Sequence, residues 1–242
     1  PKNAEPGTLA LFMQFNGASV YEPSKECKSG RITLCVSPHS LELGQSKSYY
    51  DDLKSGKLKG YGFNETYNAS RETVYFREMI LRDVQAMRFL KTYFTADGAD
   101  ARFRGLWDGK NLTLAGGSQG GLQCAAVAAL EPGATRAEFY CPWLCDVGGC
   151  GTDGRQASTY MPVWTEALEY YDNVNFAKRI RCDVEIKSAG LGDYVATPAG
   201  VTAFYNSINP AVSKQITYNQ NTTHAAYGVD AKSYVRKQAA KK

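Results

Sequence analysis

The sequence has no low-complexity tract and no apolar run approaching the ~20 residues that a membrane-spanning helix needs. It also lacks a basic stripe with interleaved aromatic residues, which a nucleic-acid-binding protein would need. The formal net charge is only +4, and part of it lies in the last seven residues. These absences argue against a membrane or nucleic-acid partner and favour a small, neutral one.

The bulk composition is that of a globular protein, with 242 residues of which 43% are hydrophobic and 21% charged. The chain enters a strand-like run almost at once, so its start is expected to be mature or trimmed, with a secreted or periplasmic location favoured over a cytoplasmic one. Seven cysteines are present. Three of them lie close together, but they lack the paired short spacings of a zinc site, so buried thiols or one disulfide are favoured over metal binding or catalysis.

Apolar runs of strand length alternate with segments of helical period along the chain. This pattern predicts an α/β fold, with a mostly parallel twisted sheet and helices on both faces. No internal repeat or linker interrupts it, so residues 1–242 are predicted to form a single domain. Strands are predicted at 9–15, 32–36, 112–115, 137–140, 184–189 and 215–218. Helices are predicted at about 76–94, 122–130 and 198–207, with a short one around 164–171.

The first of these helices carries the clearest periodic signal. Its apolar residues recur at spacings of three and four and form one stripe: Phe76, Ile80, Val84, Met87, Leu90 and Phe94. Ser70 is expected to cap its start, and Glu72 suits the positive end of the helix dipole. Residues 40–70 are rich in Ser, Gly, Lys, Tyr and Asn and are predicted to form a long loop.

The segment 116–120 (GGSQG) follows the third predicted strand and precedes an alanine-rich helix. It matches the nucleophile-elbow pattern, in which a strand turns sharply into a helix and lifts a serine hydroxyl above the sheet. Small residues flank the serine because larger side chains would clash with the neighbouring strand and helix. A glycine-rich phosphate loop is the alternative, but the glycine spacing of a dinucleotide site and the Lys-Ser/Thr of a P-loop are missing. Ser118 is therefore the predicted nucleophile.

A serine nucleophile needs a base, and the base needs an orienting acid, in the chain order serine, acid, histidine for this fold. The chain has two histidines. His224 follows the last predicted strand, where the base is expected, whereas His39 precedes the serine and is predicted to be a loop residue bordering the site. Asp193 stands just past the fifth strand and is the predicted acid, with Asp172 in reserve. A simple turn-forming role for Asp193 stays open.

Acyl transfer also needs two convergent backbone N–H donors for the oxyanion. One is predicted at Gln119, directly after the nucleophile. The other is expected in the loop after the first strand, at residues 16–18, which could equally be an ordinary turn. Trp143, Trp164 and Tyr194 could either stack on a sugar or anchor the core and loops.

Three segments together resemble a known family: 115–121 (AGGSQGG), 171–177 (YDNVNFA) and 190–193 (GLGD), the last preceding a helix that contains proline. They are similar to the acetyl xylan esterase and cephalosporin C deacetylase family (carbohydrate esterase family 7) of the α/β-hydrolase superfamily. The resemblance runs from about residue 9 to 227. It implies an α/β-hydrolase fold, no cofactor, no metal, and removal of acetyl groups from small esters such as acetylated xylo-oligosaccharides.

By the same resemblance, Ser118, Asp193 and His224 take the triad positions, and Gln119 takes that of the first oxyanion donor. Ala18 inherits the second, where the family usually has a tyrosine. The family's N-terminal strands and helix have no counterpart here, so the chain is expected to be the catalytic core of a longer protein. The insert around residues 141–160 also differs from the typical version, and a ring-like homo-oligomer stays open.

The predicted function is therefore that of a serine carboxylesterase acting on an oligosaccharide or other small ester. One alternative is a different α/β-hydrolase esterase or peptidase that takes a bulkier acyl group. Another is a non-catalytic carbohydrate-binding protein on the same scaffold, which a complete triad disfavours.

Overall fold

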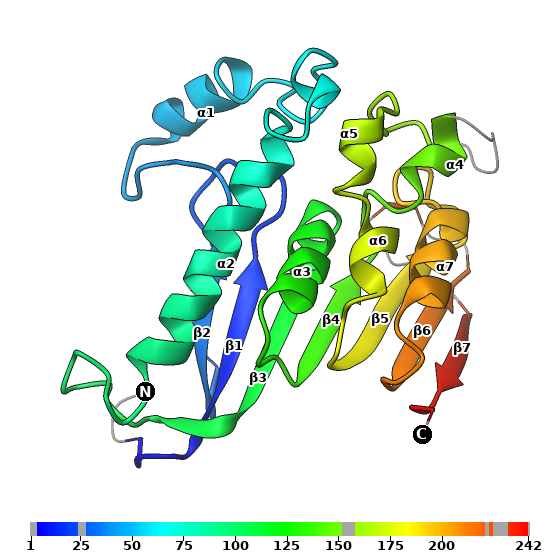
Figure 1. Ribbon diagram of the computed structural model, residues 1–242. Coiled ribbons are helices and arrows are strands. Elements are labelled where there is room, and N and C mark those ends of the chain that lie inside the picture. Colours follow the sequence, from blue (N-terminus) through cyan, green and yellow to red (C-terminus); the bar gives the residue numbers. More distant parts are fainter. Residues whose placement is uncertain (1–3, 24–27, 152–157, 221–222, 225–231, 242) are drawn as a thin grey trace.

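One mixed sheet forms the centre of the molecule, with its strands in the order β2-β1-β3-β4-β5-β6-β7 (Figure 1). A computed structural model describes residues 4–23, 28–151, 158–220, 223–224 and 232–241. The first six strands run parallel, and β7 pairs antiparallel with β6. The strands are β1 (Leu9–Phe15), β2 (Arg31–Val36), β3 (Trp107–Gly117), β4 (Arg136–Tyr140), β5 (Asp183–Gly190), β6 (Lys214–Asn219) and β7 (Ser233–Gln238).

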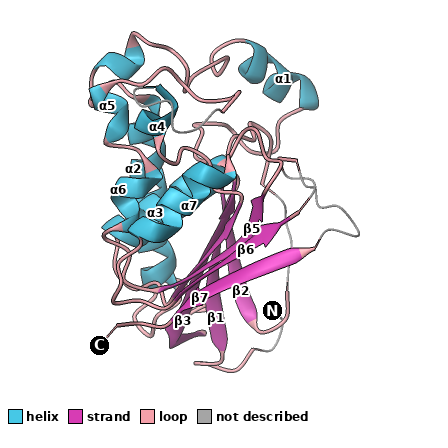
Figure 2. Ribbon diagram, turned by 90° about the vertical axis from the view of Figure 1, so that its right-hand side faces the viewer, coloured by secondary structure: helices cyan, strands magenta, loops and turns pink. Residues whose placement is uncertain are grey.

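Four helices lie side by side along one face of this sheet (Figures 1 and 2). They are α2 (Tyr75–Tyr93), α3 (Gln119–Leu130), α6 (Asn173–Ala177) and α7 (Pro198–Ser207). Three shorter helices lie above the carboxyl ends of the strands: α1 (Lys47–Ser55), α4 (Val147–Gly151) and α5 (Glu166–Glu169), and a 3-10 turn spans Tyr67–Ala69. No helix among the described residues is long and apolar enough to span a membrane. The predicted α/β architecture with a mostly parallel sheet is present.

The core lies between the sheet and the four helices. The apolar stripe predicted for α2 faces it, because Phe76, Ile80, Met87 and Leu90 are all buried. Helix α3 is buried almost throughout, which explains why its apolar residues show little periodicity and why small alanines dominate it. Alternate residues of each central strand complete the core, as in Leu9–Phe15, where every second side chain is buried.

The opposite face of the sheet differs from the prediction of helices on both faces. All helices that pack on the sheet within the described ranges cover one side, and Figure 2 shows the strands without helices on the other. That face carries polar and charged side chains from β4 and β5, including Glu138, which accepts hydrogen bonds from Arg136 at 2.8 Å and from Lys187 at 2.6 Å. Charged side chains of this kind are typical of a strand face that is open to solvent.

Two local predictions were wrong. The loop predicted for residues 40–70 contains α1, whose start is capped by Ser46 through a hydrogen bond from the Tyr49 N–H. Helix α2 begins at Tyr75, close to its predicted start, but Ser70 does not cap it: Val74 is the N-cap residue, and the Ser70 hydroxyl contacts Glu72 in the preceding turn. In both places a local turn or a tertiary contact decides the boundary, and the periodic pattern does not contain that information.

Candidate active site

Ser118 lies at the sharp turn between β3 and α3, with backbone angles φ 50° and ψ −121°. This strained conformation is rare for a residue with a side chain and is typical of functional sites. The flanking glycines are sterically required. A Cβ atom on Gly116 would lie 2.0 Å from the Gly120 carbonyl oxygen, and one on Gly120 would lie 2.8 Å from the Phe15 carbonyl oxygen. The turn is held to the next strand because the Ser118 N–H donates to the Tyr140 carbonyl at 2.9 Å.

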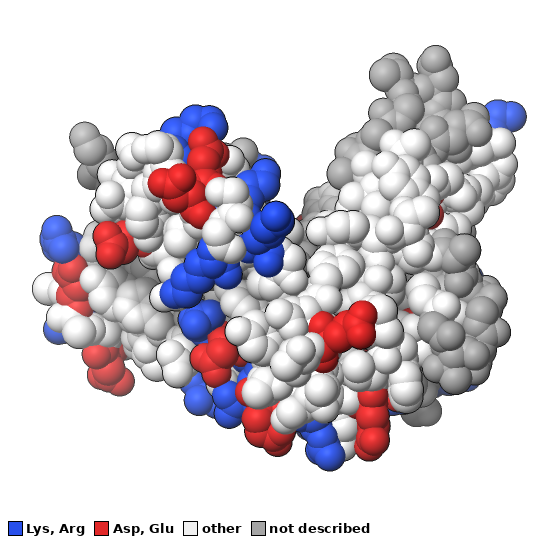
Figure 3. Space-filling view, turned by 90° about the horizontal axis from the view of Figure 1, so that it is seen from above, with Lys and Arg blue, Asp and Glu red and all other residues white. Residues whose placement is uncertain are grey.

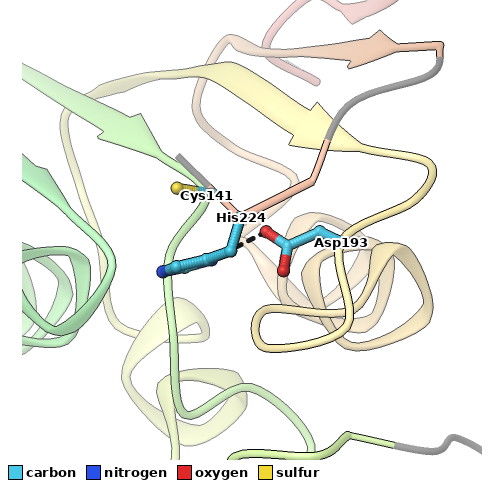
Figure 4. Close-up of side chains that lie close together, drawn as sticks. All are labelled: Cys141, Asp193 and His224. Carbon is cyan, nitrogen blue, oxygen red and sulfur yellow. Dashed lines mark hydrogen bonds and ion pairs between the residues drawn. The ribbon is translucent and has the colours of Figure 1, made fainter. Parts of the chain in front are cut away.

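The structure brings the three predicted triad residues together. His224 Nε2 lies 2.9 Å from Ser118 Oγ, and His224 Nδ1 lies 2.9 Å from Asp193 Oδ2. Figure 4 shows the imidazole of His224 and the carboxylate of Asp193 joined in this way. These contacts correspond to a ring that carries its proton on Nδ1, donates it to the carboxylate and accepts from the serine hydroxyl.

Asp193 is held rigidly in this position. Its Oδ1 accepts hydrogen bonds from the N–H groups of Val195 at 2.8 Å and Ala196 at 2.9 Å, while Oδ2 accepts the hydrogen bond from His224 Nδ1. Its side chain is only 1% exposed, whereas that of His224 is 19% exposed. A buried carboxylate with an oriented histidine at its outer side is the arrangement that lets the imidazole act as a base.

The reserve acid, Asp172, lies elsewhere and has a structural role. It caps α6 and accepts from the N–H groups of Asp146 at 3.0 Å, Val147 at 2.7 Å and Val174 at 2.9 Å. Burial raises the pKa of Asp172 to about 6, against the opposing effect of these three donors. The carboxyl group clamps a strained segment, because Leu144 and Asp146 both have positive φ angles.

The loop after β1 lies beside the elbow, as the oxyanion-hole prediction requires. Gly17, at φ 62°, packs so closely that a Cβ atom would lie 3.0 Å from the Gly120 nitrogen. The Gly17 N–H already donates to Gln123 Oε1 at 3.0 Å, so the next N–H along the loop is that of Ala18. Within the described part of the chain, neither the Ala18 nor the Gln119 N–H donates a hydrogen bond to the protein. Residues 16–18 also form a turn, through the Ser19 N–H and the Asn16 carbonyl.

Two buried polar residues that were not predicted support this loop. Gln123 of α3 accepts from Gly17, and its Nε2 donates to Asp83 Oδ2 of α2 at 2.8 Å. Asp83 is fully buried, and burial raises its pKa to about 8. Its other oxygen, Oδ1, has no hydrogen-bond partner among the described residues. One feature of the sequence indicates that Asp83 is buried, because it lies three residues after Ile80 and thus falls within the apolar stripe of the helix.

A tyrosine and the second histidine border the other side of the elbow. The Tyr61 hydroxyl donates to the side-chain oxygen of Gln119 at 2.8 Å. His39 is buried, with its ring centroid 4.9 Å from that of Tyr61 and its Nδ1 2.9 Å from the Tyr75 hydroxyl. Burial lowers the pKa of His39 to about 4, so this imidazole is neutral at ordinary pH. His39 thus borders the site, as predicted, and contacts the residues that orient Gln119.

The aromatic residues divide between the core and the surface. Trp143 is only 2% exposed, and its indole N–H donates to the Tyr160 carbonyl at 2.7 Å. It therefore holds the loop that contains Tyr160 in place, and its ring is not available to stack on a sugar. Trp164 is partly buried, while Tyr194 is 54% exposed. Seen from above the strand ends, blue and red side chains are interspersed, and no large field of one sign covers the visible surface (Figure 3).

Comparison with known proteins gives a consistent set of relatives. A model of the acetyl xylan esterase family matches residues 27–240. Acetyl esterase Axe7A of Xylanibacter ruminicola is 26% identical over 232 residues, which cover 91% of this chain and 50% of that protein. The chain therefore spans about half the length of this curated relative.

Solved structures show the same fold. An acetyl xylan esterase from a Paenibacillus species superposes with a TM-score of 0.65 at 20% identity, covering 93% of this chain and 72% of that one. Acetyl xylan esterase 1 from a Thermoanaerobacterium species gives a TM-score of 0.64 at 21% identity, covering 93% and 71% of the two chains.

Proposed function

The chain belongs to the acetyl xylan esterase family, and we propose that it is a serine carboxylesterase that removes acetyl groups from acetylated oligosaccharides such as xylo-oligosaccharides. One observation carries the proposal. The serine, histidine and aspartate form an unbroken chain of hydrogen bonds, at 2.9 Å each, over a strained elbow. The names of the relatives support acetate as the acyl group and xylan as the source of the substrate.

In the first step, His224 Nε2 takes the proton from Ser118 as Oγ attacks the ester carbonyl carbon. The imidazolium that forms is stabilised by the buried carboxylate of Asp193. The developing oxyanion is held by the N–H groups of Gln119 and Ala18, which donate no hydrogen bond to any of the described residues. The histidine then gives its proton to the leaving sugar oxygen, and the acetyl group remains on the serine.

In the second step, a water molecule takes the place of the departed alcohol. His224 removes a proton from this water as its oxygen attacks the acetyl carbonyl, and the same two N–H groups hold the second oxyanion. Collapse of the intermediate returns the proton to Ser118 and releases acetate. Ser118 is partly exposed at the strand ends, so both the ester and the water can reach it.

The test is release of acetate from acetylated xylo-oligosaccharides, together with hydrolysis of p-nitrophenyl acetate and of longer p-nitrophenyl esters. The wild type should cleave the acetyl ester faster than the longer ones, and Ser118→Ala should lower kcat by about 10⁴-fold or more. Faster cleavage of the longer esters would indicate that the preferred acyl group is bulkier than acetyl. A folded wild type without turnover on any ester would refute the proposal.

A further inference from the structure

A cysteine thiol lies beside the triad and takes no part in the proposed reaction. Cys141 follows β4, Asp193 follows β5 and His224 follows β6, and these three strands are neighbours in the sheet. Parallel strands end at the same edge, so their following residues converge there. One ligand atom from each of the three side chains lies within 4.8 Å of the other two. Figure 4 shows the three side chains gathered in one place.

The position of Cys141 is fixed by the backbone. Its φ angle is 37°, in the left-handed region, and its N–H donates to the Ser188 carbonyl of β5 at 2.8 Å. The residue is 4% exposed, as is Asp193, so both side chains lie in a low-dielectric environment. His224 is more exposed and forms the side of the cluster that solvent reaches.

The three donors are a thiol sulfur, an imidazole nitrogen and a carboxylate oxygen. This set suits a thiophilic divalent cation such as Zn²⁺ or Cd²⁺, whereas Mg²⁺ and Ca²⁺ prefer oxygen ligands alone. One thiolate and one carboxylate together balance the charge of a dication. Tetrahedral zinc places its N, O and S donors roughly 3.5 Å apart, so side-chain movements of about 1 Å would close the cluster around an ion.

We propose that Cys141, Asp193 and His224 form a binding site for a thiophilic divalent cation, and that the bound cation reversibly blocks the triad. Among the described residues this is the one group of three such side chains that lie close enough to share an ion. The inference concerns the same site as the proposed esterase function, and its activity readout rests on that function.

Blocking follows from the tautomer of the histidine. A cation bound at Nδ1 displaces the proton of that nitrogen, and the neutral ring then carries its proton on Nε2. Nε2 is the nitrogen that must accept the Ser118 proton, so the ring can no longer act as a base. On binding, the thiol loses its proton to solvent, the ring proton passes from Nδ1 to Nε2 by way of solvent, and the cation forms bonds to the thiolate, the imidazole and the carboxylate. Removal of the cation restores the original hydrogen bonds.

The experiment compares the wild type, Cys141→Ser and, as a matched control, Cys182→Ser, which changes a buried cysteine directly before β5. Zn²⁺ should inhibit p-nitrophenyl acetate hydrolysis by the wild type and by Cys182→Ser, and a chelator should restore the rate. Cys141→Ser should keep its uninhibited rate within about twofold, and the Zn²⁺ concentration for half-inhibition should rise at least about tenfold, since a ligand is lost. Mg²⁺ should have no effect on any of the three.

A second measurement does not depend on turnover. Titration with Cd²⁺ should give a sulfur-to-cadmium charge-transfer absorption that is present in Ser118→Ala and absent in Cys141→Ser. Equal inhibition of the wild type and Cys141→Ser, or equal cadmium absorption by both, would overturn the proposal. A wild type that neither binds Cd²⁺ through Cys141 nor responds to Zn²⁺ would also overturn it. If the protein proves to have no esterase activity, the cadmium absorption alone decides the question.

Discussion

The buried contact from Asp83 through Gln123 to Gly17 should determine how well the oxyanion is held. Gln123→Met is the informative perturbation, because methionine keeps the length and helix preference of glutamine but offers the Gly17 N–H only a weak thioether acceptor in place of the amide oxygen. The nucleophile, base and acid are untouched by this change. The loop that carries the Ala18 N–H, however, loses the hydrogen bond that joins it to α3.

The expected size of the effect can be bounded. Complete loss of one oxyanion donor costs about 10²- to 10³-fold in kcat. Here the donor itself remains and only its support is removed, so the loss should be near that of one hydrogen bond, about 1 to 1.5 kcal/mol, or roughly tenfold in kcat. KM should change by less than about twofold, because the ground-state carbonyl gains little from the donor.

The assay is the steady-state rate on p-nitrophenyl acetate, measured beside urea unfolding of the same samples. Gln123→Met leaves Asp83 and the Gly17 N–H without their partner, so it should also lower stability by about 1 to 3 kcal/mol. Asp83→Asn is the matched control, since its amide oxygen can still accept from Gln123, and it should keep kcat near the wild-type value. A folded Gln123→Met enzyme with wild-type kcat would refute the reasoning.

Three further predictions concern stability. Burial raises the pKa of Asp83 to about 8, so the folded protein disfavours the ionised carboxylate more than the unfolded chain does. The free energy of unfolding of the wild type should therefore fall as the pH rises from about 4 to 8, by at most the order of 5 kcal/mol. Urea unfolding across this range should show a smaller fall for Asp83→Asn. Gly116→Ala should fail to yield folded protein, because its Cβ atom would lie 2.0 Å from a backbone oxygen. Gly117→Ala should fold, because its Cβ atom would have its nearest contacts at 3.5 Å. Soluble yield and circular dichroism distinguish the two variants. Asp172→Ala should lower the thermal midpoint clearly, at a cost of about 2 to 4 kcal/mol, because three backbone N–H groups lose their acceptor, and an unchanged melting curve would contradict the clamp.

The parallel part of the fold could be predicted because strands and helices alternate with distinct periods. Strand β7 (Ser233–Gln238) could not, since its residues are nearly all exposed and two of its six are basic. Such an edge strand is defined by its pairing with β6 rather than by burial. Helix α1 was also missed. It buries only Tyr50, whose hydroxyl donates to the Glu42 carbonyl at 2.9 Å, so its stability comes from contacts outside the helix.

The candidate site could be predicted where one residue type, one neighbouring strand and the chain order together left a single choice. That was the case for Ser118 and His224, whereas Asp193 was favoured with Asp172 in reserve; the structure places Ser118, His224 and Asp193 in hydrogen-bond contact. The supporting residues Gln123 and Asp83 could not be found in this way. Their contact depends on how α2 and α3 lie against each other, and a sequence pattern gives the faces of two helices but not which residues meet between them.

The hydrogen bond between Ser118 and His224 joins residues 106 positions apart, and strands β4, β5 and β6 lie between them in the chain. Closing such a distant contact requires the intervening strands to be paired first, because loop closure over a long unfolded segment is entropically costly. The elbow alone can form early, from β3 and α3, but it then has no base. On the proposed mechanism, a chain in which β6 is not yet in place is inactive towards esters, and the appearance of activity reports completion of the parallel part of the sheet.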